Sequence, residues 1–386
     1  MSIAPYTYRM PVEVVFGEGC IGSLEERLHG LGRKPFVVAG MRSARELGLL
    51  ERIERAFPSA VVFEGVDENP GTTVCDNGAM QCRAAECDCV AAIGGGSPMD
   101  AAKAIAGLAR NDGRCVDHLG RGAFPNGALP ILAVPTTAGS GSEVTPYAVL
   151  INDDTGRKAT IGSPALFPRI ALLDPALTVS LPRSVTVNTG LDALSQAMEG
   201  IVSNKANPAA EPLALEAIRI VREALPNAAE RPGDLEARGK MLHGAMLAGC
   251  VIAQTGTTLV HGMGYWLTLE CGVPHGLANA LLLTPLFQHN AAVHPQRVAR
   301  IAEALGHPCA PEPASAREAI ATALHELLRD LEVSPAAADH GVDAAKLPQF
   351  AREIAEDPYR FRNQPGELDE AACLRLLEQA CEGKAA

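Results

Sequence analysis

Four potential metal ligands lie between Gly190 and Gly276. Asp192 and Gln196 stand four residues apart in GLDALSQAMEG, a helical pattern that places both side chains on one face. His261 lies in the apolar stretch TGTTLVHGMGYWLT, and His275 follows a Gly-Val-Pro break that indicates a turn into a new helix. A carboxylate, an amide oxygen and two imidazoles suit Fe(II), Zn(II), Co(II) or Ni(II) better than calcium. On spacing alone, the alternative is a polar helix face with two histidines in the core.

A glycine-rich turn follows an apolar strand in the first half of the chain. The strand ends in Gly94, Gly95 and Gly96, after which Ser97 is expected to cap a helix with Pro98 as its first residue. Glycines allow close approach of a ligand, and a helix N-terminus offers free N–H groups to a pyrophosphate. We therefore predict a phosphate cradle, although the sequence lacks GxGxxG. An ordinary turn between strand and helix is the alternative.

Hydroxyl side chains fill a second loop, PTTAGSGSEVT, which follows another apolar strand. Thr136, Thr137, Ser140 and Ser142 would offer donors at the carboxyl end of that strand, where open α/β sheets bind ligands. The alternative is a loop whose hydroxyls cap the backbone that follows them.

The stretch after the strand KPFVVAG bears on cofactor choice. Gly40, Arg42 and Ser43 occupy the position that meets the adenosine ribose in a dinucleotide site, and no acidic residue stands there. Arg42 could pair with a 2′-phosphate, so this stretch favours NADP(H) over NAD(H). The alternative for Arg42 is a solvated surface charge.

Composition and charge limit the functional class. The chain has 386 residues, a formal net charge of −12 and no run of basic residues, which argues against nucleic acid or anionic membranes as partners. Its eleven cysteines show no paired spacing, which favours reduced thiols. We see no signal peptide and no apolar stretch of membrane-spanning length. These features predict a cytoplasmic protein.

The pattern of predicted strands and helices changes near residues 178–185. Before this point, short apolar runs alternate with amphipathic helical patterns, such as one helix expected from Ser43 to Phe57, which is typical of a parallel α/β sheet. After it, helical patterns follow one another with no convincing strand. We therefore predict an α/β dinucleotide-binding domain over residues 1–181 and an all-α metal and substrate domain over residues 182–386.

An ordered set of motifs resembles the iron-containing (group III) alcohol dehydrogenases. The motifs are GGGSPMDAAK, PTTAGSGSEVT, LLDPALT, GLDALSQAMEG, LVHGMGY and VPHG. The resemblance covers nearly the whole chain and implies a dehydroquinate synthase-like fold with the active site in a cleft between two domains. It also implies hydride transfer between NAD(P)H and a small primary alcohol or aldehyde, a divalent metal with Fe2+ foremost, and a homodimer.

The resemblance implies roles for individual residues. The metal ligands fall on Asp192, Gln196, His261 and His275, and the two histidines count with Tyr265 as catalytic residues. The resemblance also adds further residues to the cofactor site, namely Asn69, Asp100, Lys158 and Leu177.

Two positions depart from the family pattern. Gln196 stands where the family usually has histidine, and an amide oxygen is a weaker donor to a borderline metal. Tyr265 stands one turn after His261, where several members carry a histidine proposed to relay the alcohol proton. A phenol with a pKa of about 10 is a less ready shuttle at neutral pH. The alternative for Tyr265 is a packed aromatic side chain.

Three hypotheses follow. The leading one is a metal-dependent, NADP(H)-preferring alcohol dehydrogenase that acts mainly as an aldehyde reductase. The second is a metal-independent reductase of an anionic substrate such as maleylacetate, or a phosphonoacetaldehyde reductase, which would need extra cationic residues at the site. The third is a non-catalytic nucleotide-binding protein whose metal site has decayed.

Overall fold

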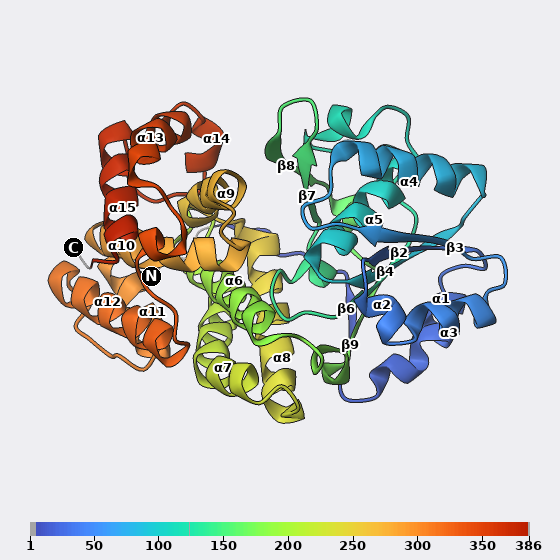
Figure 1. Cartoon of the computed structure of the whole chain (residues 1–386), viewed down its shortest axis with the longest axis horizontal. Coiled ribbons are helices and arrows are strands. Elements are labelled where there is room, and N and C mark those ends of the chain that lie inside the picture. The colour runs from blue at the N-terminus through green and yellow to red at the C-terminus, as the bar shows by residue number, and fades with distance from the viewer. Residues whose placement is uncertain (1–4, 123, 385–386) are drawn as a thin grey trace. The chain divides into compact units, whose positions relative to one another are not determined.

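The computed structural model describes residues 5–122 and 124–384, which form two compact units (Figure 1). One unit is Met10–Ser180. The other combines the described residues up to Arg9 with those from Leu181 onward. Arg9 is held there by Gln254, whose Oε1 accepts a hydrogen bond from Arg9 N and whose Nε2 donates to Arg9 O, both at 2.9 Å.

The first unit is built on a six-stranded parallel sheet, which confirms the predicted α/β class. Its strands lie in the order β1 (Glu13–Phe16), β9 (Ile170–Leu173), β6 (Ile131–Pro135), β4 (Cys89–Gly94), β2 (Pro35–Gly40) and β3 (Val61–Val66). Strands β6, β4 and β2 are neighbours, so the loops that leave their carboxyl ends emerge at one edge of the sheet.

Helices cover both faces of this sheet, and therefore its central strands are apolar throughout (Figure 1). On one face, Phe36 and Val38 pack with helices α4 (Thr72–Ala84) and α5 (Gly96–Leu108). On the other face, Val37 and Ala39 pack with α1 (Leu24–His29), α2 (Ser43–Glu46) and α3 (Leu49–Ala56). Successive residues of β2 thus enter two different cores, as the alternation of side chains along a strand requires.

In this unit one expected helix is divided, and one sheet was not predicted. The helix expected from Ser43 to Phe57 is two helices, α2 and α3, because Gly48 between them adopts a left-handed conformation with φ of 68°. A small second sheet was not predicted. It contains β5 (Gly120–Arg121), β8 (Arg157–Gly162) and β7 (Tyr147–Asn152), of which β7 and β8 form an antiparallel hairpin.

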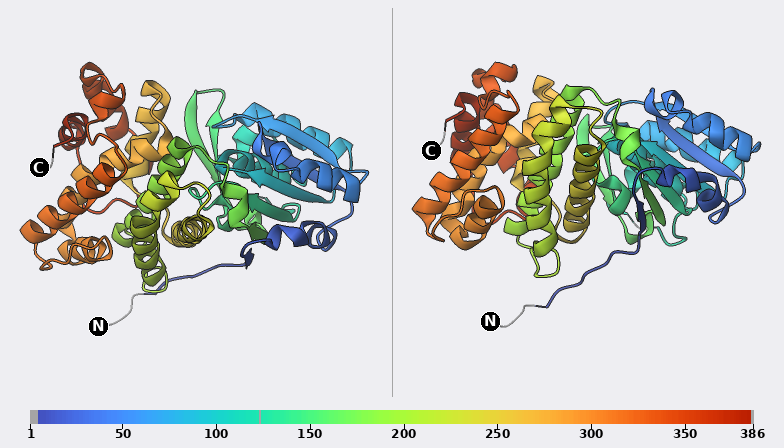
Figure 2. Two further views of the ribbon diagram at one scale, coloured as in Figure 1. Left: turned by 60° about the horizontal axis from the view of Figure 1, so that its bottom comes forward. Right: turned by 90° about the horizontal axis from the view of Figure 1, so that it is seen from below.

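The second unit is helical, as predicted, and its described residues from Arg183 onward contain no strand (Figure 2). Its longer helices are α6 (Arg183–Val202), α7 (Glu211–Glu230), α8 (Leu235–Thr255), α9 (Leu259–Cys271), α10 (His275–Val293), α12 (Pro313–Asp330) and α15 (Glu370–Glu382). Shorter ones are α11 (Pro295–Ala304), α13 (Leu347–Ala355) and α14 (Pro358–Phe361). Helices α6, α7 and α8 pack side by side. No helix in the described residues is long and apolar enough to span a membrane.

Glycines allow the helices that carry the potential ligands to approach one another. A Cβ at Gly276, in the first turn of α10, would lie 1.7 Å from Asn188 O of α6. A Cβ at Gly264, in α9, would lie 2.0 Å from Oδ1 of Asn279 in α10. A side chain at Gly276 would meet the backbone of α6 and force α6 and α10 apart, so glycine is needed there. A side chain at Gly264 would have to displace the Asn279 amide.

Candidate active site

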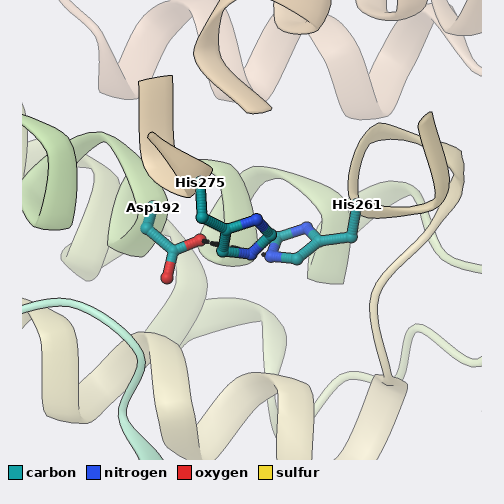
Figure 3. Close-up of side chains that lie close together, drawn as sticks. All are labelled: Asp192, His261 and His275. Atoms are coloured by element: carbon teal, nitrogen blue, oxygen red, sulfur yellow. Dashed lines mark ion pairs between the residues drawn. The ribbon is translucent and has the colours of Figure 1, made fainter. Parts of the chain in front are cut away.

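Three potential metal-ligating side chains from three helices point toward one another (Figure 3). Asp192 comes from α6, His261 from α9 and His275 from the first residue of α10. One ligand atom from each lies within 4.8 Å of the others. Asp192 Oδ1 is 3.3 Å from His261 Nε2 and 3.8 Å from His275 Nε2. Asp192 and His261 are buried and His275 is half-buried, so the cluster lies at a partly accessible position.

Gln196 joins this cluster through Asp192. Its Nε2 donates a hydrogen bond to Asp192 Oδ2 at 3.1 Å, as the spacing of one helical turn allows. Its Oε1 is buried and accepts no hydrogen bond from the described residues. A buried oxygen without a donor is uncommon in proteins and is often explained by an ion or a water. Gln196 therefore contacts Asp192 of the cluster, and its amide oxygen is left without a donor among the described residues.

Glu199 is a functional candidate that we did not single out from the sequence. Its side chain is fully buried, and its Oε2 is hydrogen-bonded to His261 Nδ1. Its Oε1 accepts from Thr258 N and Thr258 Oγ1, both at 2.7 Å, and from His261 N at 3.3 Å. Glu199 thereby fixes the ring of His261 with Nε2 directed at Asp192. Its position seven residues after Asp192, on the same helix face, is the signal that could have revealed it.

The carboxylates on either side of His261 set the electrostatics of the cluster. Burial alone would lower the pKa of His261, but the charge of Glu199 and the hydrogen bonds to Asp192 and Glu199 raise it to about 10. Burial would raise the pKa of Asp192, but the hydrogen bond from His261 and the charge of His275 hold it below its ordinary value. The cluster thus stabilises positive charge, as a cation site must.

Aromatic and cationic side chains border the histidines. The ring of Tyr265 stacks on His275, with centroids 5.2 Å apart and planes at 19°, and meets His261 edge-on at 6.4 Å. Tyr265 is half-buried rather than enclosed in the core. The guanidinium carbon of Arg360 lies 6.0 Å from the centre of the Tyr265 ring, and Arg360 Nη1 donates to Gly262 O at 2.9 Å. An arginine of which only 13% is exposed therefore lies one side chain away from His275.

The predicted cofactor residues of the first unit gather at the carboxyl ends of β2, β4 and β6. Thr136 N donates to Gly94 O at 2.9 Å, and Thr136 Oγ1 donates to Ser43 Oγ at 3.3 Å. A Cβ at Gly95 would lie 3.3 Å from Thr137 Oγ1, and a Cβ at Gly96 would lie 2.8 Å from Ser140 Oγ. The three loops therefore touch one another, and the glycines permit their close approach.

Helix α5 begins earlier than expected, so Ser97 does not cap it. Gly95 is the residue before the helix, with an extended backbone, and Gly96 is its first residue. Ser97 then lies in the first turn, where its Oγ accepts a hydrogen bond from Asn69 N at 3.1 Å. The error arose because glycine can supply the extended conformation that a capping serine usually provides. The contact places Asn69 beside the glycine turn.

A buried network under these loops contains a lysine that we did not consider at first. Ser142 Oγ donates to Asp100 Oδ1 at 2.5 Å, and Lys103 Nζ donates to Ser142 Oγ at 2.6 Å, to Thr145 Oγ1 at 3.1 Å and to Tyr147 O at 2.8 Å. Burial raises the pKa of Asp100 and lowers that of Lys103 to about 8. The Ser142 hydroxyl donates to Asp100 and accepts from Lys103, so Ser142 fixes the loop and its hydroxyl proton is not available to a cofactor.

The remaining predicted cofactor residues differ in their surroundings. Arg42 is exposed at the carboxyl end of β2, next to Gly40, and makes no ion pair with any described residue. Lys158 is half-buried on β8, and its charge acts on Asp100. Leu177 is 6% exposed and packs in the apolar core beside β9.

Comparison with known proteins gives consistent matches over nearly the whole chain. Residues 11–175 match the family described as iron-containing alcohol dehydrogenase, and residues 186–381 match the C-terminal region of the same family. The chain is 32% identical to 1,3-propanediol dehydrogenase of Klebsiella pneumoniae, over 98% of this chain and 100% of that protein.

Solved structures agree with these matches. A crystal structure of 1,3-propanediol oxidoreductase has a TM-score of 0.91 and 31% identity, covering 98% of this chain and 100% of that one. The crystal structure of sulfoacetaldehyde reductase from Bifidobacterium kashiwanohense in complex with NAD+ has a TM-score of 0.86 and 32% identity, covering 98% and 99%.

Proposed function

The chain belongs to the iron-containing alcohol dehydrogenase family and is an NAD(P)-dependent oxidoreductase of alcohols and aldehydes, and on that premise we propose that it is a metal-dependent, NADP(H)-preferring enzyme acting mainly as a reductase of small aldehydes. The observation that carries this proposal is the cluster of Asp192, His261 and His275, with the buried Gln196 Oε1 beside it.

The residues of the cluster fit a divalent metal. One carboxylate, two imidazoles and one amide oxygen form a set suited to Fe(II) first, and to Zn(II), Co(II) or Ni(II). The unpartnered oxygen of Gln196 supports its place in that set, since a cation would satisfy it. When bound, the metal supplies Lewis-acid polarisation of a substrate oxygen, and the nicotinamide supplies or accepts the hydride.

The protein side chains then have distinct tasks. Asp192 contributes the only negative charge among the four proposed ligands. Glu199 holds His261 in one orientation, so that Nε2 rather than Nδ1 is available to the metal. Tyr265 lies beside both histidines, and we assign its hydroxyl the relay of the alcohol proton.

Metal content tests this proposal directly. Protein purified anaerobically without chelator should contain close to one iron, zinc, cobalt or nickel per chain by elemental analysis. Gln196→His should bind that metal more tightly, because imidazole is the better donor to borderline metals. If Gln196→His changed neither metal affinity nor activity, position 196 would not be a ligand.

The preference for NADP(H) rests on the exposed Arg42. Its guanidinium has no ion pair within the described part of the chain, and neither Gly40 nor Ser43 adds a negative charge. A hydrogen-bonded pair between Arg42 and a 2′-phosphate should favour NADPH over NADH by about tenfold or more in kcat/KM. Arg42→Ala should abolish this preference by lowering kcat/KM with NADPH, and kcat/KM with NADH should stay the same. An equal loss with both cofactors would contradict the assignment.

We also propose a cytoplasmic homodimer. All eleven cysteines are free thiols, which suits a reducing compartment. Strand β1 lies at one edge of the six-stranded sheet, and Phe16 at its end is 44% exposed. Such an edge is a natural surface for pairing with a second copy. Light scattering after size-exclusion chromatography should give twice the chain mass.

A second candidate substrate class is favoured by one observation, the position of Arg360. Its guanidinium lies beside Tyr265, near the proposed ligands. Nε pairs with Asp357 Oδ2 at 3.1 Å and Nη1 donates to Gly262 O, so Nη2 is the group that could receive the acidic group of a sulfo- or phosphono-aldehyde. One relative is named sulfoacetaldehyde reductase. If this candidate holds, Arg360→Gln should reduce turnover of sulfoacetaldehyde and phosphonoacetaldehyde far more than that of propanal.

Chelation separates this candidate from a metal-free one. Loss of all activity after chelator treatment, with recovery on adding metal, supports the metal-dependent enzyme on either substrate class. Full activity after metal removal would instead support a metal-independent reductase of anionic substrates.

A further inference from the structure

A cavity of about 130 Å³ lies in the helical unit and is lined by residues of α10, α12 and α15 and of the segment before α15. These three helices are labelled in Figure 1. Its polar lining comes from His289, Arg317, Arg375 and Gln379, and its apolar lining includes Pro285 and Leu376. Pro285 and His289 follow His275 by ten and fourteen residues along α10, which places them about 15 and 21 Å from it along the helix axis. The cavity is therefore separate from the proposed metal site.

Two exposed arginines stand at the rim of this half-open cavity without a carboxylate partner among the described residues. Arg317 donates from Nε to Gln288 O at 3.1 Å, and neither Arg317 nor Arg375 forms an ion pair with any residue that the structure describes. Glu378 stands only three residues after Arg375 yet does not pair with it. Most of their guanidinium donors thus remain available, although the chain as a whole carries a net charge of −12.

His289 adds an unsatisfied buried nitrogen to the same wall. Its Nε2 is shielded from solvent and has no hydrogen-bond partner among the described residues. Burial and the charge of Arg317 lower the pKa of His289, so the imidazole is neutral near pH 7 and can place its one N–H on Nε2. With the N–H on Nε2, the ring needs an acceptor, which the arginines cannot supply because they offer only donors.

The size of the cavity suits a small ligand. Its volume is about four times the share of one molecule in liquid water, which is enough for phosphate or a short organic acid. Two guanidinium groups bind planar or tetrahedral oxyanions through paired hydrogen bonds, and the apolar wall of Pro285 and Leu376 suits a short carbon chain.

We propose that this cavity is a binding site for a small oxyanion, either phosphate or the carboxylate of a short organic acid, held by Arg317, Arg375 and His289. The proposal does not depend on the metal site, because none of these residues contacts it.

Titration calorimetry with inorganic phosphate tests the site. The full chain is saturated with NADPH beforehand, so that the glycine turn after β4 is blocked, and ionic strength is held constant with sodium chloride. Wild type should show saturable phosphate binding at millimolar concentration or below, and R317Q and R375Q should each weaken it by roughly tenfold. A parallel titration with succinate distinguishes a phosphate site from a carboxylate site, and binding of either supports the proposal.

Arg83→Gln is the matched control, because Arg83 is an exposed arginine of the other unit and the substitution changes the net charge equally. It should bind the anion as wild type does. Arg375 makes no hydrogen bond or ion pair within the described residues, so R375Q should fold normally even if R317Q does not. Unchanged binding in R375Q, or no saturable binding of either anion to wild type, would overturn the proposal.

Discussion

Two buried glutamates, one in each unit, lie in opposite surroundings. Glu199, in the helical unit, is fully buried and receives hydrogen bonds on both carboxylate oxygens, from Thr258 and His261. Glu143, in the loop after β6, is 1% exposed, but its Oε2 has no hydrogen-bond partner in the described residues. Burial raises the pKa of Glu143 to about 7.

The difference distinguishes a carboxylate that is hydrogen-bonded as part of a site from one that is buried with an unpartnered oxygen. A carboxylate that receives several hydrogen bonds stays charged in a buried position and can orient a neighbouring histidine. A buried carboxylate with one oxygen lacking a donor binds a proton more readily, and its ionisation in the folded protein reduces stability. We therefore expect changes around Glu199 to alter metal binding, and changes at Glu143 to alter stability in a pH-dependent manner.

The largest effect should come from removing the partner of Glu199. His261→Ala should lower kcat by about a thousandfold, because it removes a ligand from a metal worth several kcal/mol to the transition state. Elemental analysis should show less bound metal, while fluorescence titration should give nearly normal NADPH affinity. A variant that kept full activity would refute the metal assignment, and so would normal metal content.

Next in size is the pH dependence at Glu143. The pKa of Glu143 is raised from its ordinary 4.5 to about 7, so its contribution to stability is full below pH 4.5 and is lost as pH rises through about 7. Glu143→Gln removes this titration. The free energy of unfolding of the variant should therefore rise relative to wild type by about 3 kcal/mol as the pH is raised from 4.5 to about 7.

Urea unfolding at several pH values measures the Glu143 effect. Glu68→Gln, an exposed glutamate of the same unit, serves as the control and should follow wild type. If the free energy of unfolding of Glu143→Gln and of wild type changed equally with pH, the Glu143 carboxylate would not have a raised pKa in solution. The contrast between the two glutamates would then disappear.

A smaller effect is expected at Glu199 itself. Glu199→Gln should weaken metal affinity by about 10- to 100-fold, because outer partners of metal-bound histidines have effects of this size. Competition with a chromophoric chelator gives the affinity directly. Ser195→Ala is the control, since Ser195 is buried in the same helix and, among the described residues, its hydroxyl donates only to the helix backbone at Leu191 O. Equal affinities in both variants would make Glu199 a structural residue only.

The smallest effect belongs to the glycine turn. Gly96→Ala would bring a Cβ to 2.8 Å from Ser140 Oγ, and the adjustment should raise the KM for NADPH about tenfold. Metal content should not change, which distinguishes this loop from the helical cluster. Gly233→Ala meets no atom within 4 Å and should behave as wild type. A loss of metal in Gly96→Ala would show that the two regions are not independent.

Features encoded by local sequence could be predicted, and features created by packing could not. The glycine turn after β4 and the alternation of strands and helices follow from residues next to one another, such as Gly94 to Gly96. The break at Gly48 was missed because one glycine can lie within a helix or end it, and only its positive φ decides. The hairpin of β7 and β8 was missed because YAVLIN is almost continuously apolar and RKATIG begins with charged residues, so neither strand alternates clearly between apolar and polar side chains.

The candidate site follows the same rule. Asp192 and Gln196 could be paired from their spacing, but their meeting with His261 and His275 depends on glycine contacts between helices. Glu199 remained hidden because its role lies in a hydrogen bond to a residue 62 positions away. Likewise, the burial of Lys103 beneath the cofactor loops depends on three acceptors that lie 39 to 44 positions further along the chain.

The hydrogen bonds between Arg9 and Gln254 have a practical consequence for expressing the helical unit on its own. The helical unit is discontinuous in sequence, because the segment ending at Arg9 belongs to it while Met10–Ser180 does not. A plasmid that starts translation at Leu181 would therefore produce a helical fragment without this segment and leave the Gln254 amide without its two backbone partners. A fragment that restores it, by joining the first nine residues to Leu181 through a short glycine-serine linker, is the better candidate for independent expression.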